Sequence, residues 1–502
     1  MATLVPAARP NDPLTRPQRI GFAALALASA GALGLALGLG TPLTYLIAGL
    51  IGPFLLLLIL VRPYWAASIY VVLVYGDILS ILTRYDNLPA LARFVGIILL
   101  STVAGYRLII RRRPLVRDEL TLWLVAYGLM VTAGIWYAQD PSLVQANVIE
   151  FIRNFLTYLI IINTVTNPMR LRVILWALLA LGTALALLTV VQSVTGQTND
   201  DFGGFSLWRV SEITGGNDAP RPGGNFGDAN YYGQFLLIVL PLGLYLTTGA
   251  GNRVARLVGL GSTAILTLAI VYTYSRGDAL ALMAVFAAAV IYKRPNPFYL
   301  ALGAVGLLIA LPVLPAGYLD RLTTILDTAA GNQQTIYNEA SLRGRAGATQ
   351  AAIAMFLDHP LLGVGRENYP LHELDYLANS NLAYKSTGIP PHDLYLEVAA
   401  EHGLLGLLVM GGTLLAVGRA LRQARRRFRA AGDLVQADLV VWLGISLFGY
   451  LVSSLFLHGA YLYMLWLQVA LIAALRQIAP RAPAVPTHFV RKGGRVWNRP
   501  SP

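Results

Sequence analysis

The feature that most constrains this chain is a succession of long apolar windows with few soluble segments between them. Windows of about 17–25 apolar residues can cross a bilayer as helices, and fourteen follow one another between residues 20 and 476. Backbone polar groups inside lipid must pair within such segments. The sequence therefore predicts an all-α polytopic membrane protein with about 12–14 transmembrane helices. The predicted helices are residues 20–39, 42–61, 64–83, 89–109, 119–138, 150–167, 171–194, 229–248, 254–274, 277–292, 297–314, 393–418, 437–456 and 459–476.

The composition agrees with a membrane protein and excludes several kinds of site. Hydrophobic residues make up 56% of the chain and charged residues only 13%, against about 25% charged residues in soluble domains. The absence of cysteine excludes disulfides, thiol nucleophiles and Cys-ligated zinc. The six histidines show neither HxxxH nor HExxH spacing, so we expect no metal and no cofactor.

The basic residues set the expected orientation. Most of the 38 Lys and Arg residues fall in alternate connections, and the positive-inside rule places those connections in the cytoplasm. The arginine runs at 111–113 and 425–427 are then topology signals, and no nucleic acid partner is expected. Residues 1–19 form a cytoplasmic segment, and the first apolar run is predicted to be a signal anchor. Residues 28–30 (ASA) leave a cleaved signal peptide open.

Two external connections are longer than simple turns. Helices 1–11 occupy residues 20–314 and are interrupted by a Gly-, Asp- and Asn-rich loop at 195–229. A larger loop, residues 315–392, precedes the twelfth helix, with helical stretches expected at 346–357 and 371–377. Helices 12–14 occupy 393–476, and 477–502 form a cytoplasmic tail. Connections of this length are usually functional or disordered.

Two external arginines lie where an anion-binding group is expected. Arg276 stands in a tight turn that needs only small residues. It either binds phosphate as a fixed guanidinium or reaches lipid headgroups or Asp278. Arg221 opens the run RPGGNFGDAN, whose glycines allow close backbone approach to a ligand. Asn230, at the end of this run, is the expected cap of the next helix.

A cluster of ionisable residues stands where the large external loop meets a helix. His392 is either a loop residue or a general base, because an imidazole with a pKa near 6.5 suits that task. Asp393 is the expected N-cap of the helix. Glu397 and Glu401 share one helix face. They are costly in a membrane and are expected to pair with external arginines or to orient His392.

Several motifs together resemble the O-antigen ligase family, which includes O-antigen polymerases and bacterial O-oligosaccharyltransferases. The resemblance is clearest from Ser275 to Leu408. It rests on the SRG turn at 275–277, on Arg345 followed by HPLLGVGRENY at 359–369, and on HDLYLEVAAEHGLLG at 392–406. The run at 221–230 resembles a further family motif. The sequence departs from the family pattern in Asp393, where an Asn is usual, and in lacking a Trp near Thr349.

The resemblance implies a GT-C-like membrane glycosyltransferase of the cell envelope, active at the external face of the cytoplasmic membrane. Its donor is then a glycan on undecaprenyl diphosphate, as in lipopolysaccharide biosynthesis, and transfer is inverting and independent of metal. Arg276 and Arg221 stabilise the departing diphosphate, Arg345 holds the loop or the diphosphate, and His392 is the catalytic base. Glu397, Glu401 and Asp393 are supporting residues.

Two kinds of alternative stay open at the level of sequence. The acceptor is a lipid, a growing glycan or a protein, which correspond to a ligase, a polymerase and an oligosaccharyltransferase. The other alternative is a polysaccharide transporter or flippase. Transporters place polar groups near the bilayer midplane in matching halves, whereas here these groups lie at external helix ends.

Overall fold

The computed structural model describes residues 63–78, 81, 103–104, 108, 112, 114–214, 217–249, 251–297, 323, 330, 340–377, 391–459 and 463–480. The predicted helices 20–39, 42–61, 89–109 and 297–314 lie wholly or largely outside these residues, as do segments 1–19 and 477–502. Within the described part, six helices are long and apolar enough to cross a membrane. The chain is therefore an all-α polytopic membrane protein, as predicted.

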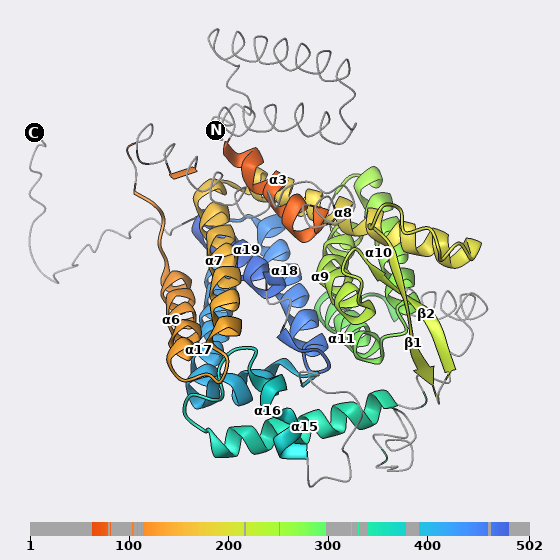
Figure 1. Cartoon of the computed structure of the whole chain (residues 1–502). Coiled ribbons are helices and arrows are strands. Elements are labelled where there is room, and N and C mark those ends of the chain that lie inside the picture. The colour runs from red at the N-terminus through yellow and green to blue at the C-terminus, as the bar shows by residue number, and fades with distance from the viewer. Residues whose placement is uncertain are drawn as a thin grey trace, which may run out of the picture.

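The described elements form a helical assembly with one small hairpin (Figure 1). In chain order they are α3 (Pro63–Tyr75), α6 (Glu119–Ala133), the short helix η2 (Gly134–Trp136), α7 (Pro141–Thr164), α8 (Pro168–Thr195), β1 (Leu207–Thr214), β2 (Asn217–Gly224), α9 (Ala229–Thr248), α10 (Arg253–Tyr272), α11 (Arg276–Lys293), α15 (Ala340–Asp358), α16 (Tyr369–Leu377), α17 (Leu394–Ala430), α18 (Leu434–Ser453) and α19 (Tyr463–Ile478).

Most predicted helices within the described residues have bounds close to the expected ones, and three differ substantially. α3 ends at Tyr75 instead of 83. α7 begins at Pro141 instead of 150, because Asp140 caps it and proline suits the first helical position. α17 continues to Ala430 instead of ending at 418, since its last turns are rich in arginine, which favours a helix C-terminus but is not apolar. Hydropathy detects only the part of such a helix that lies in lipid.

The two ends of the assembly differ in character. α9, α11 and α17 begin at one end, called the histidine end because His392 lies there, and they finish at the other, the arginine-rich end. The helix α15 lies across the histidine end (Figure 1), and α15 with α16 confirms that the large loop is partly helical. The hairpin of β1 and β2, which the sequence did not predict, lies in the first long loop and pairs Arg209 with Arg221.

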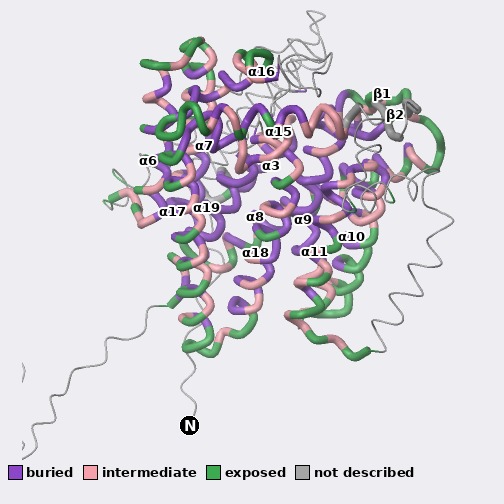
Figure 2. The backbone as a smooth tube through the Cα atoms, turned by 90° about the horizontal axis from the view of Figure 1, so that it is seen from below, coloured by how far each residue is buried: buried purple, intermediate pink, exposed green. Residues whose placement is uncertain are grey.

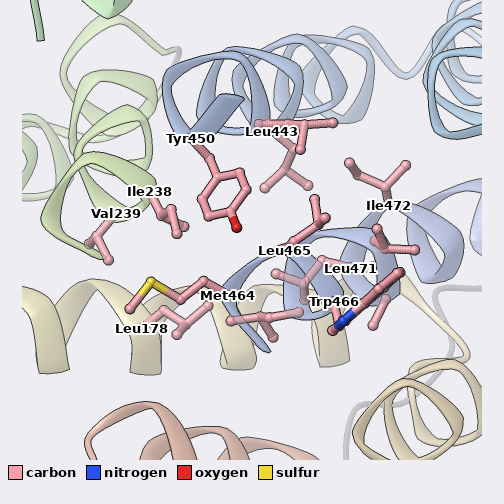
Figure 3. Packing of buried hydrophobic residues seen from close by; sticks show 14 of the residues in the cluster. Leu178, Ile238, Val239, Leu443, Tyr450, Met464, Leu465, Trp466, Leu471 and Ile472 are labelled. Atoms are coloured by element: carbon pink, nitrogen blue, oxygen red, sulfur yellow. The ribbon is translucent and has the colours of Figure 1, made fainter. Parts of the chain in front are cut away.

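The core is centred on α19. Almost every residue of this short helix is buried, as expected for a helix that is apolar on all sides and surrounded by others. Met464 lies beside Leu178 of α8 (Figure 3). Trp466 packs against Tyr127 of α6 and Phe151 of α7, with ring centroids 5.0 and 6.0 Å apart. Buried positions concentrate in the middle of the assembly and exposed ones along its outer faces (Figure 2).

α17 is broken at Gly403, and the segment 360–365 completes the break. Gly403 has φ 60° and ψ −153°, a conformation that suits glycine alone. Four backbone hydrogen bonds replace those lost in the helix. Val364 and Gly365 donate to the carbonyls of Ala400 and Glu401 (3.0 and 2.9 Å), while Leu404 and Leu405 donate to Pro360 and Leu361 (2.7 and 3.2 Å). The large loop is thereby fixed to the first turns of α17.

Candidate active site

Four residues predicted from the sequence lie on four different elements at the histidine end. Arg221 is on β2, Arg276 begins α11, Arg345 is on α15 and His392 lies two residues before α17. Local capping fixes where these elements start. Ser275 caps α11, with Oγ accepting from the Asp278 N–H at 3.3 Å. Because these elements come together at the histidine end, residues that are distant in sequence lie close to one another there.

Arg221 ties the hairpin to the turn between α10 and α11. Its side chain is buried, with Nε donating to the Thr273 carbonyl at 2.8 Å and Nη2 donating to Asn230 Oδ1 at 3.3 Å. The expectation that Asn230 caps α9 is wrong. Asp228 is the cap, accepting from the N–H groups of Asn230 and Tyr231 at 2.8 and 3.1 Å. A carboxylate at that position leaves the Asn230 side chain available to Arg221.

The three arginines lie within electrostatic range of one another. Burial, together with the positive charges of Arg276 and Arg221, lowers the pKa of Arg345 to about 10. Burial likewise lowers the pKa of Arg221, an effect that Asp228 and Asp278 partly offset and Arg276 reinforces. Repulsion among neighbouring cations of this kind is relieved by a bound anion. The region is therefore electrostatically suited to a phosphate or diphosphate.

Asp278 of α11 lies next to this region and contacts both α9 and α18. One carboxylate oxygen accepts from Ser453 Oγ at 2.7 Å, and the other lies close to Gly233 of α9. A Cβ atom at Gly233 would stand 2.2 Å from that oxygen, so α9 and α11 approach each other only because this residue is glycine. The charge of Asp278 reaches both Arg221 and Arg345.

His392 is paired with a second histidine. The Nδ1 atoms of His392 and His458 are 3.2 Å apart. The ring of His458 packs edge-on against Tyr231 with ring centres 5.4 Å apart, and the Tyr231 hydroxyl donates to the His458 carbonyl at 3.3 Å. Burial lowers the pKa of His392 well below its ordinary value, and the charges of Arg345 and His458 add to this. Mainly through burial, the pKa of His458 is lowered to about 4. Both rings are therefore neutral at pH 7.

Glu397 and Glu401 pair with an arginine, as predicted, and the partner is Arg366. Its Nη1 donates to Glu397 Oε1 at 2.7 Å and to Glu401 Oε2 at 2.8 Å. All three side chains are almost fully buried, with 6% of the arginine and 2% of each glutamate exposed. The other oxygen of Glu397 accepts from the N–H of Gly459, next to His458. This buried cluster thus connects α17 to the segment that carries His458.

Asp393 is the N-cap of α17, as expected. Its carboxylate accepts from the N–H groups of Tyr395 and Leu396 at 2.8 and 3.0 Å. The N–H of Leu394, the first residue of α17, donates to the Ser454 carbonyl at 2.9 Å and joins the start of α17 to the end of α18. These contacts hold the backbone beside His392 in place.

Comparison with known families gives a match in this part of the chain. Residues 261–411 match the family model described as O-antigen ligase. Over these residues the chain is similar to the O-antigen ligase family. The matched residues include Arg276, Arg345 and His392, and the match agrees with the resemblance drawn from the sequence motifs. No curated protein matches the chain.

The matched region holds most, but not all, of the cluster. Arg221 and His458 lie outside residues 261–411, and the fold brings them to this region. Sequence reasoning gave His458 no role, and no local pattern marks it. Arg366 lies in the motif at 359–369, and the sequence analysis gave it no role. The feature that could have identified it is a single cation in an apolar segment, which needs acidic partners such as Glu397 and Glu401. Across the described residues, no three His, Asp or Glu side chains converge as metal ligands.

Proposed function

We propose that this protein is an inverting glycosyltransferase that moves a glycan from undecaprenyl diphosphate to an acceptor hydroxyl at the external face of the cytoplasmic membrane. The observation that carries the proposal is the position of Arg345. The charges of Arg276 and Arg221 act on Arg345, and the charge of Arg345 acts on His392, so these groups lie within electrostatic range of one another. An anion site and a candidate base are therefore neighbours, as displacement of a diphosphate by a hydroxyl requires.

The arginines have the role of stabilising the leaving group. In a single displacement, the acceptor oxygen forms a bond to the anomeric carbon while the bond from that carbon to the diphosphate oxygen breaks. The electron pair leaves with the diphosphate, and the three guanidinium groups stabilise the developing charge. Attack opposite the leaving group inverts the anomeric configuration. In this proposal the arginines supply the charge that a divalent cation supplies in other enzymes.

His392 accepts the proton of the acceptor hydroxyl. This requires a free lone pair on Nε2, hence a hydrogen on Nδ1 that is donated to Nδ1 of His458. His458 is then a positioning residue, because it selects the tautomer and the ring orientation of the base. Tyr231 and the Arg366 cluster hold His458 in turn.

The proposal is tested by transfer with purified full-length protein. A glycan linked to undecaprenyl diphosphate is incubated with candidate lipid, glycan and peptide acceptors, and the anomeric configuration of the product is determined. We expect transfer with inversion that persists in excess EDTA. Transfer that is lost in EDTA and restored by a divalent cation would contradict the role of the arginines.

The pH dependence of transfer tests whether His392 is the base and whether Arg345 lowers its pKa. Since His392 acts as the neutral form and its pKa is lowered, kcat/KM is expected to hold as pH falls through 6.5 and to decline only in more acidic solution. Arg345→Gln removes one cause of the lowered pKa, so the acidic decline moves to higher pH. The matched control is Arg343→Gln on the same helix, which leaves the position of the decline unchanged. If the acidic decline is unchanged in Arg345→Gln, the charge of Arg345 does not lower the pKa of His392.

A further inference from the structure

A separate cavity of about 710 Å³ opens at the arginine-rich end of the assembly. It lies where α8 and α18 begin and where α9 and α11 finish. α9 has 20 residues, so its two ends are about 30 Å apart. The cavity is therefore remote from His392 and has no part in the proposed transfer. The predicted orientation places it in the cytoplasmic leaflet of the membrane.

The walls of the cavity are apolar and aromatic. Leucines of α8 and α9 line it, together with Trp176, whose side chain is 43% exposed, and with Tyr245. Tryptophan and tyrosine are enriched where a helix passes from the hydrocarbon to the headgroups. The leucines are Leu175, Leu179, Leu242 and Leu246. Such a surface suits acyl chains.

The rim of the cavity has an excess of positive charge. Arg172, Lys293 and Arg429 line it with a single carboxylate, Asp438. Asp438 is engaged by Lys293 Nζ at 2.8 Å and by the Tyr292 hydroxyl at 2.6 Å. Arg172 and Arg429 have no ion-pair partner among the described residues. Their guanidinium groups are exposed beside apolar walls, an arrangement that fits a phosphate joined to hydrocarbon chains.

We propose that this cavity binds an anionic glycerophospholipid of the cytoplasmic leaflet, with its phosphate at Arg172 and Arg429 and its acyl chains along the leucines. The N-terminal apolar run of the chain is the competing occupant. Its flanks carry Arg16, Arg19 and Arg62, which the cations of the rim repel. An anionic lipid neutralises that rim instead, and basic pockets between membrane helices bind such headgroups.

Lipid binding to the purified full-length protein tests the proposal. Native mass spectrometry is used to compare dioleoyl phosphatidylglycerol with dioleoyl phosphatidylcholine, which has the same chains and no net charge. We expect preferential binding of phosphatidylglycerol, weakened about fivefold by Arg172→Gln or Arg429→Gln and further by the double variant. Arg422→Gln is the control, since this exposed arginine of α17 does not line the cavity.

Three results would overturn the proposal. They are equal binding of the two lipids, undiminished binding by the double variant, and equal loss in Arg422→Gln. Glycerol phosphate is added as a competitor, and displacement of the lipid at a concentration no higher than that of the lipid itself would show that the acyl walls contribute nothing. Crosslinking of residues 20–61 to Trp176 in the lipid-free protein, undisturbed by phosphatidylglycerol, would assign the cavity to the chain itself.

Discussion

The His392→Ala variant is expected to lose at least about a hundredfold in kcat, because general base catalysis contributes roughly 10²–10⁴-fold. Loss of the imidazole leaves the acceptor proton without a partner, while the arginines that bind the diphosphate are untouched. KM for the donor is therefore expected to change little. The rate is measured with purified protein and saturating donor. His359→Ala is the matched control, because this exposed histidine lies in the same large loop.

Variants of His458 distinguish a role in positioning the base from a role in packing alone. His458→Ala removes the proposed acceptor for Nδ1 of His392 and is expected to lower kcat by about tenfold or more. His458→Asn retains an oxygen near the position of Nδ1 and is expected to recover part of the rate. Near wild-type transfer by His392→Ala would rule out its role as base. Equal losses in the Ala and Asn variants of His458 would rule out tautomer selection.

Hydropathy predicted the helices well and the connections poorly, for a physical reason. α9 begins and ends at the predicted residues, because a spanning segment must be apolar over a fixed length. The hairpin was missed because β2 contains Pro220, Pro222 and two glycines, which are unfavourable in strands. Its pairing depends on contact with the helical assembly, and local propensity does not record such contacts.

The candidate site shows the same division. Arg276 and His392 were proposed from the sequence because each is a polar group at the end of an apolar helix, a feature that is visible in the sequence alone. His458 was missed because its significance depends on His392, which is 66 residues away. The break at Gly403 was missed for a related reason. A glycine in an apolar helix is common, and only the segment 360–365 shows that its backbone groups are satisfied elsewhere.

The break in α17 fixes the position of the large loop relative to this helix. Residues 394–402 precede the break and carry Glu397 and Glu401, which bind Arg366 of the loop. The glutamates therefore fix the loop, α17 and the Gly459 backbone at one point. A displacement of the loop would disturb the contact between His392 and His458, so the stability of this cluster and the geometry of the proposed base are linked.

Arg366→Ala is expected to lower the free energy of unfolding by about 3–5 kcal/mol or to prevent the protein from accumulating. Removing one partner of a buried ion cluster leaves uncompensated charge, and here two buried carboxylates lose their shared cation. Unfolding of the purified protein in detergent is followed by heat or denaturant. Arg153→Ala is the matched control. It breaks an exposed pair with Glu150 (2.7 Å), and exposed pairs contribute only about 0–1 kcal/mol.

A triple variant tests whether unpaired charge is the cause. Arg366→Met with Glu397→Gln and Glu401→Gln removes all three charges, and glutamine at position 397 still offers an oxygen to the Gly459 N–H. Because replacing a whole buried ion cluster is often nearly neutral, the triple variant is expected to be more stable than Arg366→Ala. If Arg366→Ala loses no more stability than Arg153→Ala, the cluster does not hold the loop. If the triple variant is as unstable as Arg366→Ala, the shape of the arginine matters more than its charge.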